Sequence, residues 1–583
     1  METNMTRRKG DAVGGDHAIT GTLPTLADVI AFKDGSAQFD HGYYRFVSHP
    51  RLRRLEDELK GRFACRHCKL TESTQVALLE LILCLRKPGI PCRIIVCTAD
   101  AVPLLDPGFL PACECEGVSV IAPVAGTAVP ADLCPADILV VSPGPGGGSA
   151  AAASAAAAKG ATVVAVMKSD GTTFPVPPPD LPGAKFFVLG LAAPSGAHAG
   201  AVLGNADRIM DRLSLQLKRR GPSLSSRVAD CLLEASAAAA APPPRGGDPN
   251  ACRRVKETLC QLEGGTHAFL YCSGMSAITR VLDLLRTPAR PQVIAVGHLY
   301  NDTFQTLRQG PAVFIGVDEL DALEGMVSDR TAAILTETIT NPLSDVPDLA
   351  VLSRIARAHG LPLVVDNTIA TPYNCHPFEF GADFVIHSTT KFLNGRNDHA
   401  GGAVIVRQES LARSLAAGQA LMEDQMSPLE AAVLQGNMGS LQERIQRFNA
   451  NAAAVASFLA AHPGASRVFY NGNPDHRSYA IARRILRGPG SVISFVLSRD
   501  TREGLRAFYD SPLSGISKAP SLGSDVTLLC PYTLLTHFDD TDEELAAIGL
   551  PRFLLRIAVG CEGTIAPVLD SLGQALQASM AQG

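Results

Sequence analysis

The sequence predicts an α/β protein built around a mostly parallel sheet, with a smaller α+β domain at its C-terminal end and an α/β extension at its N-terminal end. Three observations carry this prediction. From about residue 250, short apolar runs alternate with helical patterns, which is typical of a parallel sheet covered by helices on both faces. The length of 583 residues predicts two to four domains. A hydrophobic content of 46% against 19% charged residues predicts a large interior.

The apolar runs after residue 250 predict seven strands, and periodic segments predict helices between them or after the last. The predicted strands cover residues 268–272, 293–296, 312–315, 332–336, 363–365, 384–387 and 402–406. The predicted helices cover residues 275–286, 347–359 and 408–418. Further on, a helical stretch at 441–461 precedes apolar runs at 492–497 and 553–559. This change of rhythm predicts the smaller C-terminal domain.

The N-terminal part has strand signals of its own, at residues 93–97, 137–141 and 162–167. A glycine-rich segment at 143–149 matches neither a dinucleotide-binding nor a Walker pattern, so we interpret it as a turn into an alanine-rich helix. The alanine-rich stretch at 235–244 ends in three prolines, which cannot continue a helix or a central strand. We therefore predict an extension of uncertain role, a linker, a large domain and a small domain, at residues 1–225, 226–249, 250–425 and 426–583.

Charge and composition argue against several classes of partner. The formal net charge of −5 gives no electrostatic reason to bind nucleic acid or an anionic membrane. We find no apolar run long enough for a transmembrane helix and no secretory signal, which predicts a cytoplasmic protein. Fifteen scattered cysteines indicate reduced thiols rather than a disulfide framework. Cys65 and Cys68 form one CxxC pair without a second, so we predict no metal site.

One lysine and one aspartate follow two of the predicted strands, about two dozen residues apart. Lys391 stands in Ile-His-Ser-Thr-Thr-Lys, and Asp366 in Val-Val-Asp-Asn-Thr. Ligands of parallel sheets bind at the carboxyl ends of the strands. Pyridoxal phosphate needs a lysine amine for its Schiff base and an acidic partner for its pyridinium nitrogen. These two residues are therefore the catalytic and cofactor-binding candidates.

The other demands of this cofactor also have candidates at strand ends. Cys-Ser-Gly-Met-Ser closes a strand and opens a helix, where Gly274 allows a close backbone approach to the phosphate. Ser388 and Thr390 supply hydroxyl donors to the same group. Tyr300, a third catalytic candidate, follows a strand and can stack on the ring, and Asn341 can hydrogen-bond the phenolic oxygen of the ring. Each feature alone has an equally good structural reading, such as a helix cap, whereas their joint order favours the cofactor site.

Residues 250–583 resemble the cystathionine γ-synthase/γ-lyase family of fold-type I pyridoxal phosphate enzymes. Eight segments carry the resemblance, in order: residues 273–278, 300–303, 337–342, 365–368, 387–395, 400–402, 521–523 and 555–560. The resemblance implies an aspartate aminotransferase-like large domain and bound pyridoxal 5'-phosphate, with Met275 and Thr368 in the cofactor site. It also implies that Ser521 and Arg556 bind the substrate, Arg556 as a bidentate clamp on the α-carboxylate. Residues 11–230 look like the N-terminal extension of fungal cystathionine γ-synthases, through 22–25, 42–46 and 224–227.

Three departures from the family pattern bear on function. A Tyr-x-Arg usually reaches the neighbouring subunit's phosphate; here Arg245 remains without the tyrosine, and Arg45 and Arg227 are rival candidates. Pro520 stands where many lyases have a glutamate, which argues against cystathionine cleavage. His399 replaces a more usual apolar residue, which indicates either an altered nucleophile pocket or a tolerant surface loop.

The resemblance therefore implies γ-replacement on an O-acyl-L-homoserine, an amino-acid substrate, in a homodimer or homotetramer. The incoming nucleophile is cysteine in the ordinary reaction, or another thiol or a carbon nucleophile in a secondary-metabolic enzyme. Lys391 moves protons between Cα and Cβ in this scheme. The alternatives are β- or γ-elimination of a sulfur amino acid, and a binding protein that has lost catalysis.

Overall fold

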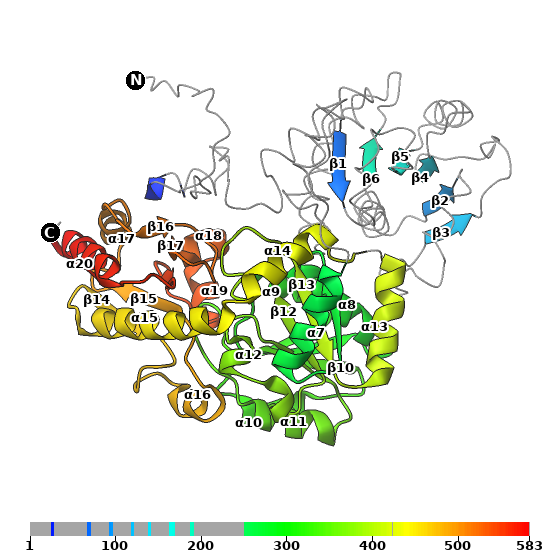
Figure 1. The fold of residues 1–583 in the computed structure, drawn as a ribbon, viewed down its shortest axis with the longest axis horizontal. Helices are drawn as coiled ribbons and strands as arrows, with labels where there is room; N and C mark the ends of the chain where they lie inside the picture. Colours follow the sequence, from blue (N-terminus) through cyan, green and yellow to red (C-terminus); the bar gives the residue numbers. More distant parts are fainter. Residues whose placement is uncertain are drawn as a thin grey trace.

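The computed structural model describes residues 25–27, 29, 250–422 and 424–581, together with the backbone of six strands between residues 67 and 191. These residues form three sheets of six, seven and five strands. Two of them build the part of the chain that holds the candidate site, and both are shown in Figure 1. No helix in this described part combines the length and the apolar character that a bilayer crossing requires.

The seven-stranded sheet has the order β7-β13-β12-β11-β10-β8-β9. Its strands are β7 (His267–Tyr271), β8 (Gln292–Val296), β9 (Ala312–Ile315), β10 (Thr331–Glu337), β11 (Leu363–Asp366), β12 (Phe384–Ser388) and β13 (Gly402–Val406). Neighbours from β9 to β12 pair in parallel, whereas β13 pairs antiparallel with both β12 and β7. The mostly parallel α/β sheet predicted from the sequence is thus confirmed.

Helices connect these strands and cover the sheet (Figure 1). They are α7 (Ala251–Glu263), α8 (Gly274–Leu285), α9 (Asn301–Arg308), α10 (Leu320–Met326), α11 (Leu349–Ala358), α12 (Thr371–Asn374), η2 (Pro377–Phe380), α13 (Glu409–Met422) and α14 (Pro428–Met438). β10 is buried along its whole length, as expected for a strand with helices on both faces. The carboxyl ends of the central parallel strands meet at one edge, and the loops that follow them build the site.

The five-stranded sheet belongs to the C-terminal part of the chain and has the order β14-β15-β18-β17-β16. Its strands are β14 (Ala465–Phe469), β15 (Val492–Leu497), β16 (Ile516–Lys518), β17 (Thr527–Pro531) and β18 (Leu555–Ala558). Its helices are α15 (Leu441–Ala461), α16 (Tyr479–Ile485), α17 (Arg502–Tyr509), α18 (Tyr532–Thr536), α19 (Asp542–Ala547) and α20 (Ala566–Ala581). This mixture of elements is the α+β arrangement that the sequence predicts.

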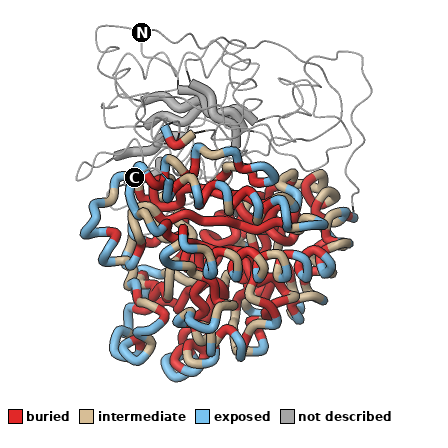
Figure 2. The backbone as a smooth tube through the Cα atoms, turned by 90° about the vertical axis from the view of Figure 1, so that its left-hand side faces the viewer, coloured by how far each residue is buried: buried red, intermediate tan, exposed pale blue. Residues whose placement is uncertain are grey.

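Two of the hydrophobic cores of the described residues share the long helix α15. Its first half places Leu441, Ile445 and Phe448 in the core of the large sheet. Its second half places Val455 and Leu459 in the core of the small sheet. Figure 2 shows the buried backbone continuing through both regions beneath an exposed outer layer. The predicted boundary after residue 425 remains a prediction, and α15 couples the packing of the two parts.

A short segment near the start of the chain packs onto the C-terminal part. Leu26 and Val29 are buried in the small-sheet core, together with Phe508 and Leu576. The backbone N–H of Leu26 donates a hydrogen bond of 2.7 Å to Asp510 Oδ1, across 484 residues of sequence. The segment that contains Leu26 and Val29 is therefore packed into the core of the small sheet.

The remaining sheet has the order β1-β6-β5-β4-β2-β3. Its strands are β1 (His67–Thr71), β2 (Cys92–Val96), β3 (Val118–Ile121), β4 (Ile138–Val141), β5 (Thr162–Lys168) and β6 (Phe187–Leu191). β3, β2, β4 and β5 run parallel, and β6 pairs antiparallel with β5 and β1. Three of these strands, β2, β4 and β5, are those predicted from the sequence.

Candidate active site

A cavity of about 130 Å³ lies where β10, β11 and β12 end and α8 begins. Its wall combines ionisable and apolar side chains from both parts of the fold. The lining includes Gly274, Met275, Tyr300, Glu337, Asn341, Asp366, Thr368, Ser388, Thr390, Lys391, Pro520, Leu522 and Arg556. The structure thus brings together all the predicted site residues that it describes except Ser521, which contacts Lys391 from the side of the small sheet.

Lys391 is the fourth residue of a tight turn that begins at Ser388, the last residue of β12. Its backbone N–H donates to Ser388 O at 3.2 Å. Its side-chain Nζ donates a hydrogen bond of 3.0 Å to Ser521 Oγ. The amine therefore lies between the end of the large sheet and the segment that precedes β17.

Asp366 is the last residue of β11, and Thr368 is its main partner. Asp366 Oδ1 accepts hydrogen bonds from the Thr368 backbone N–H at 2.9 Å and from the Thr368 hydroxyl at 2.5 Å. Thr368 Oγ1 in turn accepts the backbone N–H of Ser388 at 2.8 Å. One threonine therefore orients the carboxylate and fixes the neighbouring strand end.

Glu337, at the end of β10, is a second buried carboxyl beside Asp366, and the two do not ionise equally. Burial and the charge of Asp366 raise the pKa of Glu337 well above its ordinary value. Burial also raises the pKa of Asp366, but both Thr368 hydrogen bonds and the charge of His387 oppose that rise. We assign the negative charge of the pair to Asp366, because its environment favours the ionised form more strongly.

The N-terminus of α8 forms the opposite wall. Ser273 caps the helix by accepting the backbone N–H of Ser276 at 3.0 Å. A Cβ atom on Gly274 would lie 2.7 Å from Ser388 Cβ and 3.0 Å from its Oγ. Glycine is therefore required for the close approach of this helix start to the Ser388 hydroxyl. The partial positive charge of the helix end and this hydroxyl together suit a phosphate.

Tyr300 and Asn341 flank the cavity and are held through Glu337 and Arg556. The backbone N–H of Tyr300 donates to Glu337 Oε1 at 2.5 Å, and its hydroxyl donates to Asp302 Oδ2 at 2.8 Å. Asn341 Oδ1 accepts a hydrogen bond of 3.2 Å from Arg556 Nη1. Asn341 is thus already engaged with the predicted carboxylate clamp.

Arg556 is buried in the middle of β18, and carbonyl groups orient its guanidinium. Its Nη2 donates to the carbonyl oxygens of Pro520 and Ser521, the latter at 2.9 Å. The aromatic ring of Tyr532 lies 5.3 Å from its central carbon. A fixed, fully buried guanidinium beside the cavity is suited to bind a carboxylate.

One of the two sequence interpretations of His399 is wrong. Its side chain is fully buried, so it does not belong to a surface loop. The other interpretation, an altered nucleophile pocket, stays a prediction, and His399 is not among the residues that line the smaller cavity. Thr390, predicted as a phosphate donor, exchanges hydrogen bonds with the backbone of Gly401 while still lining the cavity.

Several predictions fall outside the described residues. Arg45, Arg227 and Arg245, the three candidates for the phosphate-binding arginine, lie there, as do the side chains of Cys65 and Cys68. Within the described ranges, no group of three or more His, Cys, Asp or Glu side chains is arranged to hold a metal ion.

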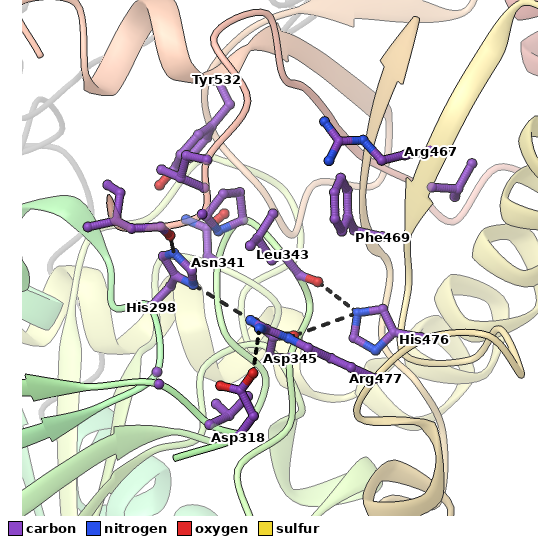
Figure 3. Close-up of a pocket in the computed structure, with 18 of the residues that line it drawn as sticks. His298, Asp318, Asn341, Leu343, Asp345, Arg467, Phe469, His476, Arg477 and Tyr532 are labelled. Carbon is purple, nitrogen blue, oxygen red and sulfur yellow. Dashed lines mark hydrogen bonds and ion pairs between the residues drawn. The ribbon is translucent and has the colours of Figure 1, made fainter. Parts of the chain in front are cut away.

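A second cavity, of about 1070 Å³, lies beside the first and shares Asn341 with it (Figure 3). Its charged centre is Asp345, which receives hydrogen bonds of 2.7 and 2.5 Å from Arg477. His298 and His476 each approach Asp345 at 3.8 Å. No lysine lines this cavity among the residues described. Although the second cavity is larger, the first cavity contains Lys391 and Asp366, so the first is the candidate active site.

Sequence reasoning missed the roles of Glu337 and Asp302. Both stand in segments that carry the family resemblance. Glu337 also directly follows the predicted strand at 332–336, as Asp366 follows 363–365, and this strand-end signal could have identified it. The sequence around Asp302 gives no such signal. Their function appears only when β8 and β10 lie side by side, since Glu337 then receives the N–H of Tyr300.

Comparison with known proteins decides the family. The model of the Cys/Met metabolism PLP-dependent enzymes matches residues 244–577, more than half of the chain. The chain belongs to this family. It is a pyridoxal phosphate-dependent transferase or lyase that acts on sulfur amino acids, and its fold is fold-type I.

Individual members of the family are similar over the same part. L-methionine gamma-lyase of Pseudomonas putida is 36% identical over 332 residues, which cover 56% of this chain and 82% of that protein. Cystathionine gamma-synthase of Mycobacterium leprae is 32% identical over 343 residues, which cover 57% of this chain and 85% of that protein. The crystal structure of cystathionine gamma synthase from Xanthomonas oryzae pv. oryzae in complex with cystathionine has a TM-score of 0.54 at 31% identity. The match covers 58% of this chain and 87% of that one.

The residues of the cavity fit the cofactor of this family, pyridoxal 5'-phosphate. The fit rests on the donor set: a lysine amine, a carboxyl group that accepts two hydrogen bonds, and a helix N-terminus that a glycine brings against a hydroxyl. Lys391, Asp366 and the Gly274–Ser388 wall are the groups suited to hold its aldehyde, ring nitrogen and phosphate.

Proposed function

We propose that this enzyme catalyses γ-replacement on an O-acyl-L-homoserine, with Lys391, Asp366 and Arg556 as its principal residues. When bound, the cofactor supplies an electron sink for bonds broken at the α- and β-carbons of the substrate. Arg556 and Ser521 bind the substrate α-carboxylate and amino-acid end. The Lys391 amine would take a proton from Cα and then one from Cβ as the acyloxy group leaves Cγ as a carboxylate. After the nucleophile has added at Cγ, it would return protons to Cβ and then to Cα.

This proposal rests on the amino-acid composition of the segment before β17. Residues 520–523 read Pro-Ser-Leu-Gly and contain no acidic side chain. Pro520 and Leu522 line the cavity, and the Pro520 carbonyl already accepts a hydrogen bond from Arg556. An apolar wall here gives no partner to the distal ammonium group of cystathionine, whereas it suits a neutral acyl ester.

The ionisation of Asp366 supports the same chemistry. A carboxylate at this position keeps the ring nitrogen protonated, which strengthens the electron sink. Burial raises the pKa of Asp366, and the two Thr368 hydrogen bonds oppose this rise by stabilising the ionised form. Loss of the acyloxy group from Cγ as a carboxylate needs carbanion character at Cβ, so a strong electron sink is required.

The names of the similar proteins favour elimination as the second candidate. The relatives include lyases of methionine and of cystathionine, at 32–36% identity. Elimination and replacement share their first half, and they differ in whether a nucleophile adds before the product leaves. The nucleophile of replacement is cysteine in the simplest case, or another thiol or a carbon nucleophile in a secondary-metabolic enzyme.

One assay separates these outcomes. Purified holoenzyme is incubated with O-acetyl-L-homoserine, with and without cysteine, and in parallel with methionine. Replacement yields cystathionine and acetate only when cysteine is present, whereas elimination yields 2-oxobutyrate without it. Lys391→Ala is the control, and it is expected to abolish both products and the visible absorbance of the lysine-bound cofactor. Elimination at equal rates with and without cysteine would refute the replacement proposal.

The resemblance to the family also leads us to propose a homodimer or homotetramer with shared sites. A subunit mixture tests this sharing, because Lys391 and the phosphate-binding arginine would lie on different chains. Mixing Lys391→Ala subunits with Arg245→Ala subunits is expected to restore about a quarter of the wild-type sites by random pairing in dimers. Parallel mixtures with Arg45→Ala and Arg227→Ala identify the donor, since only the correct arginine gives complementation.

A further inference from the structure

His399, in the loop between β12 and β13, has hydrogen-bond partners on both ring nitrogens. Its Nε2 lies 2.9 Å from Thr389 Oγ1. Its Nδ1 lies 2.8 Å from Glu430 Oε2, at the start of α14. The exposed fraction is 0% for the His399 side chain and 5% for that of Glu430. A buried imidazole bonded at both ends is a rigid link between the two groups that it joins.

The partners of Glu430 define the direction of these hydrogen bonds. Glu430 Oε2 also accepts the backbone N–H of Ala400 at 3.1 Å, so this oxygen faces two donors. His399 Nδ1 therefore carries a proton and donates it. In the imidazole with a single proton, Nε2 then accepts from the Thr389 hydroxyl. We call this chain, from Thr389 through His399 to Glu430, the relay.

The relay ends two residues before Lys391. Thr389 and Thr390 lie between the end of β12 and the lysine, so a displacement of Thr389 moves the turn that carries the amine. On the other side, Arg444 from α15 donates to Phe392 O at 3.0 Å and to Leu393 O at 3.1 Å. The lysine backbone is thus anchored to α14 before it and to α15 after it.

The packing around the relay leaves it little freedom. A Cβ atom on Gly401 would lie 2.6 Å from Thr389 Oγ1 and 2.8 Å from His399 Nε2. Only glycine therefore admits this hydroxyl–imidazole contact. Glu430 is itself fixed, because its backbone N–H donates to the N-cap hydroxyl of Ser427 at 3.2 Å. Every member of the relay is held from outside as well as by its neighbour.

We propose that His399 is a positioning residue, which sets the orientation of the Lys391 amine through Thr389 and Glu430. The inference rests on the role of Lys391 in the proposed function, but it holds for replacement and for elimination alike. His399 does not line the cavity, so it acts through the turn rather than on the substrate. Misplacing a reacting group by about 1 Å costs on the order of 100-fold in rate.

Two pairs of variants test the proposal in the full-length holoenzyme. Thr389→Val removes the hydroxyl at nearly constant volume, and Thr389→Ser is its matched control because it keeps the hydroxyl. His399→Val removes both hydrogen bonds, whereas Glu430→Gln keeps an acceptor oxygen for Nδ1. The readouts are kcat and KM separately, the pH titration of the visible absorbance of the lysine-bound cofactor, and hydrogen exchange of residues 389–401.

Thr389→Val and His399→Val are expected to lower kcat by about 10- to 100-fold with KM changed less than threefold. They are also expected to move the midpoint of the absorbance titration and to speed exchange in the loop. Thr389→Ser is expected to stay within threefold of wild type, and Glu430→Gln to fall between. Thermal unfolding of each variant shows whether it folds. If His399→Val does not fold, Thr389→Val still tests the proposal.

Wild-type titration midpoints and kcat in both Thr389→Val and His399→Val, even at reduced thermal stability, would overturn the inference and leave His399 as a packing residue. The failure of the proposed function looks different. If the proposed role of Lys391 is wrong, Lys391→Ala retains the visible absorbance, and the inference about His399 then loses its basis as well.

Discussion

Removing the Thr368 hydroxyl is expected to raise the pKa of Asp366 and to narrow the pH range of activity from the acid side. This hydroxyl donates to Asp366 Oδ1 at 2.5 Å, in a site where both residues are partly buried. The backbone N–H of Thr368 keeps its own bond of 2.9 Å to the same oxygen. Thr368→Val therefore removes one of two hydrogen bonds to the carboxylate.

The size of the effect follows from the strength of that bond. A hydrogen bond to a charged group contributes about 1.5–3 kcal/mol. Since 1.36 kcal/mol corresponds to one pKa unit, the pKa of Asp366 is expected to rise by about 1 to 2. The sign is fixed, because the lost bond stabilised the ionised form. The same substitution leaves the Ser388 N–H without the acceptor that it has at 2.8 Å, which loosens the phosphate side of the site.

The assay is the pH dependence of kcat/KM, together with a pH titration of the cofactor absorbance. In Thr368→Val, the acid limb of the profile is expected to move to higher pH, with the alkaline limb unchanged. Thr368→Ser keeps the hydroxyl and is expected to give the wild-type profile. The reasoning is refuted if Thr368→Val leaves the acid limb within about 0.3 of wild type, or if Thr368→Ser moves it as far.

Three further predictions concern other parts of the fold. Arg556→Lys is expected to raise KM for amino-acid substrates by about 10- to 100-fold in steady-state kinetics, because an ammonium forfeits one of two parallel bonds to a carboxylate, while the cofactor absorbance is retained. Burial would raise the pKa of Asp345, but Arg477, His298 and His476 lower it on balance, so its charge stabilises the protein at neutral pH and this stabilisation is lost as the pH falls through the lowered pKa. Asp345→Asn is therefore expected to reduce the free energy of unfolding by about 3 kcal/mol at pH 7 and to narrow its difference from wild type below pH 3, as measured by urea unfolding. Leu26→Ala is expected to cost about 2–5 kcal/mol in the same measurement, because the side chain is 1% exposed, whereas Ala27→Ser, at an exposed neighbour, should have no effect.

The sequence predicted the pairing of Lys391 with Asp366 because parallel topology brings strand ends together. Once the apolar runs are read as neighbouring parallel strands, residues that follow them must meet at one edge. The structure places β11 beside β12 in that way. The lysine and the aspartate needed no information beyond local pattern and this rule.

The same patterns did not reveal what depends on distant partners. His399 lies in a loop of polar residues and glycines, which is typical of a surface. Its burial is tolerable because Thr389 and Glu430, the latter 31 residues further on, provide partners for its two ring nitrogens. α9 spans eight residues and its N-cap makes no side-chain hydrogen bond, so it lacks the usual start signal. Glu337 stands at the end of a fully buried strand, where a carboxyl is unexpected until the backbone of Tyr300 is seen to reach it.

The docking of Leu26 onto the small-sheet core sets an order of events during synthesis. Its hydrogen-bond partner Asp510 is added to the chain 484 residues later. At translation rates of about 5–20 residues per second, the segment waits roughly 25 to 100 s before its binding surface exists. Until then the core that buries Leu26 and Val29 is incomplete, so this contact cannot form. The contact is therefore among the last to form, and it reports that the C-terminal part of the chain has been made and folded.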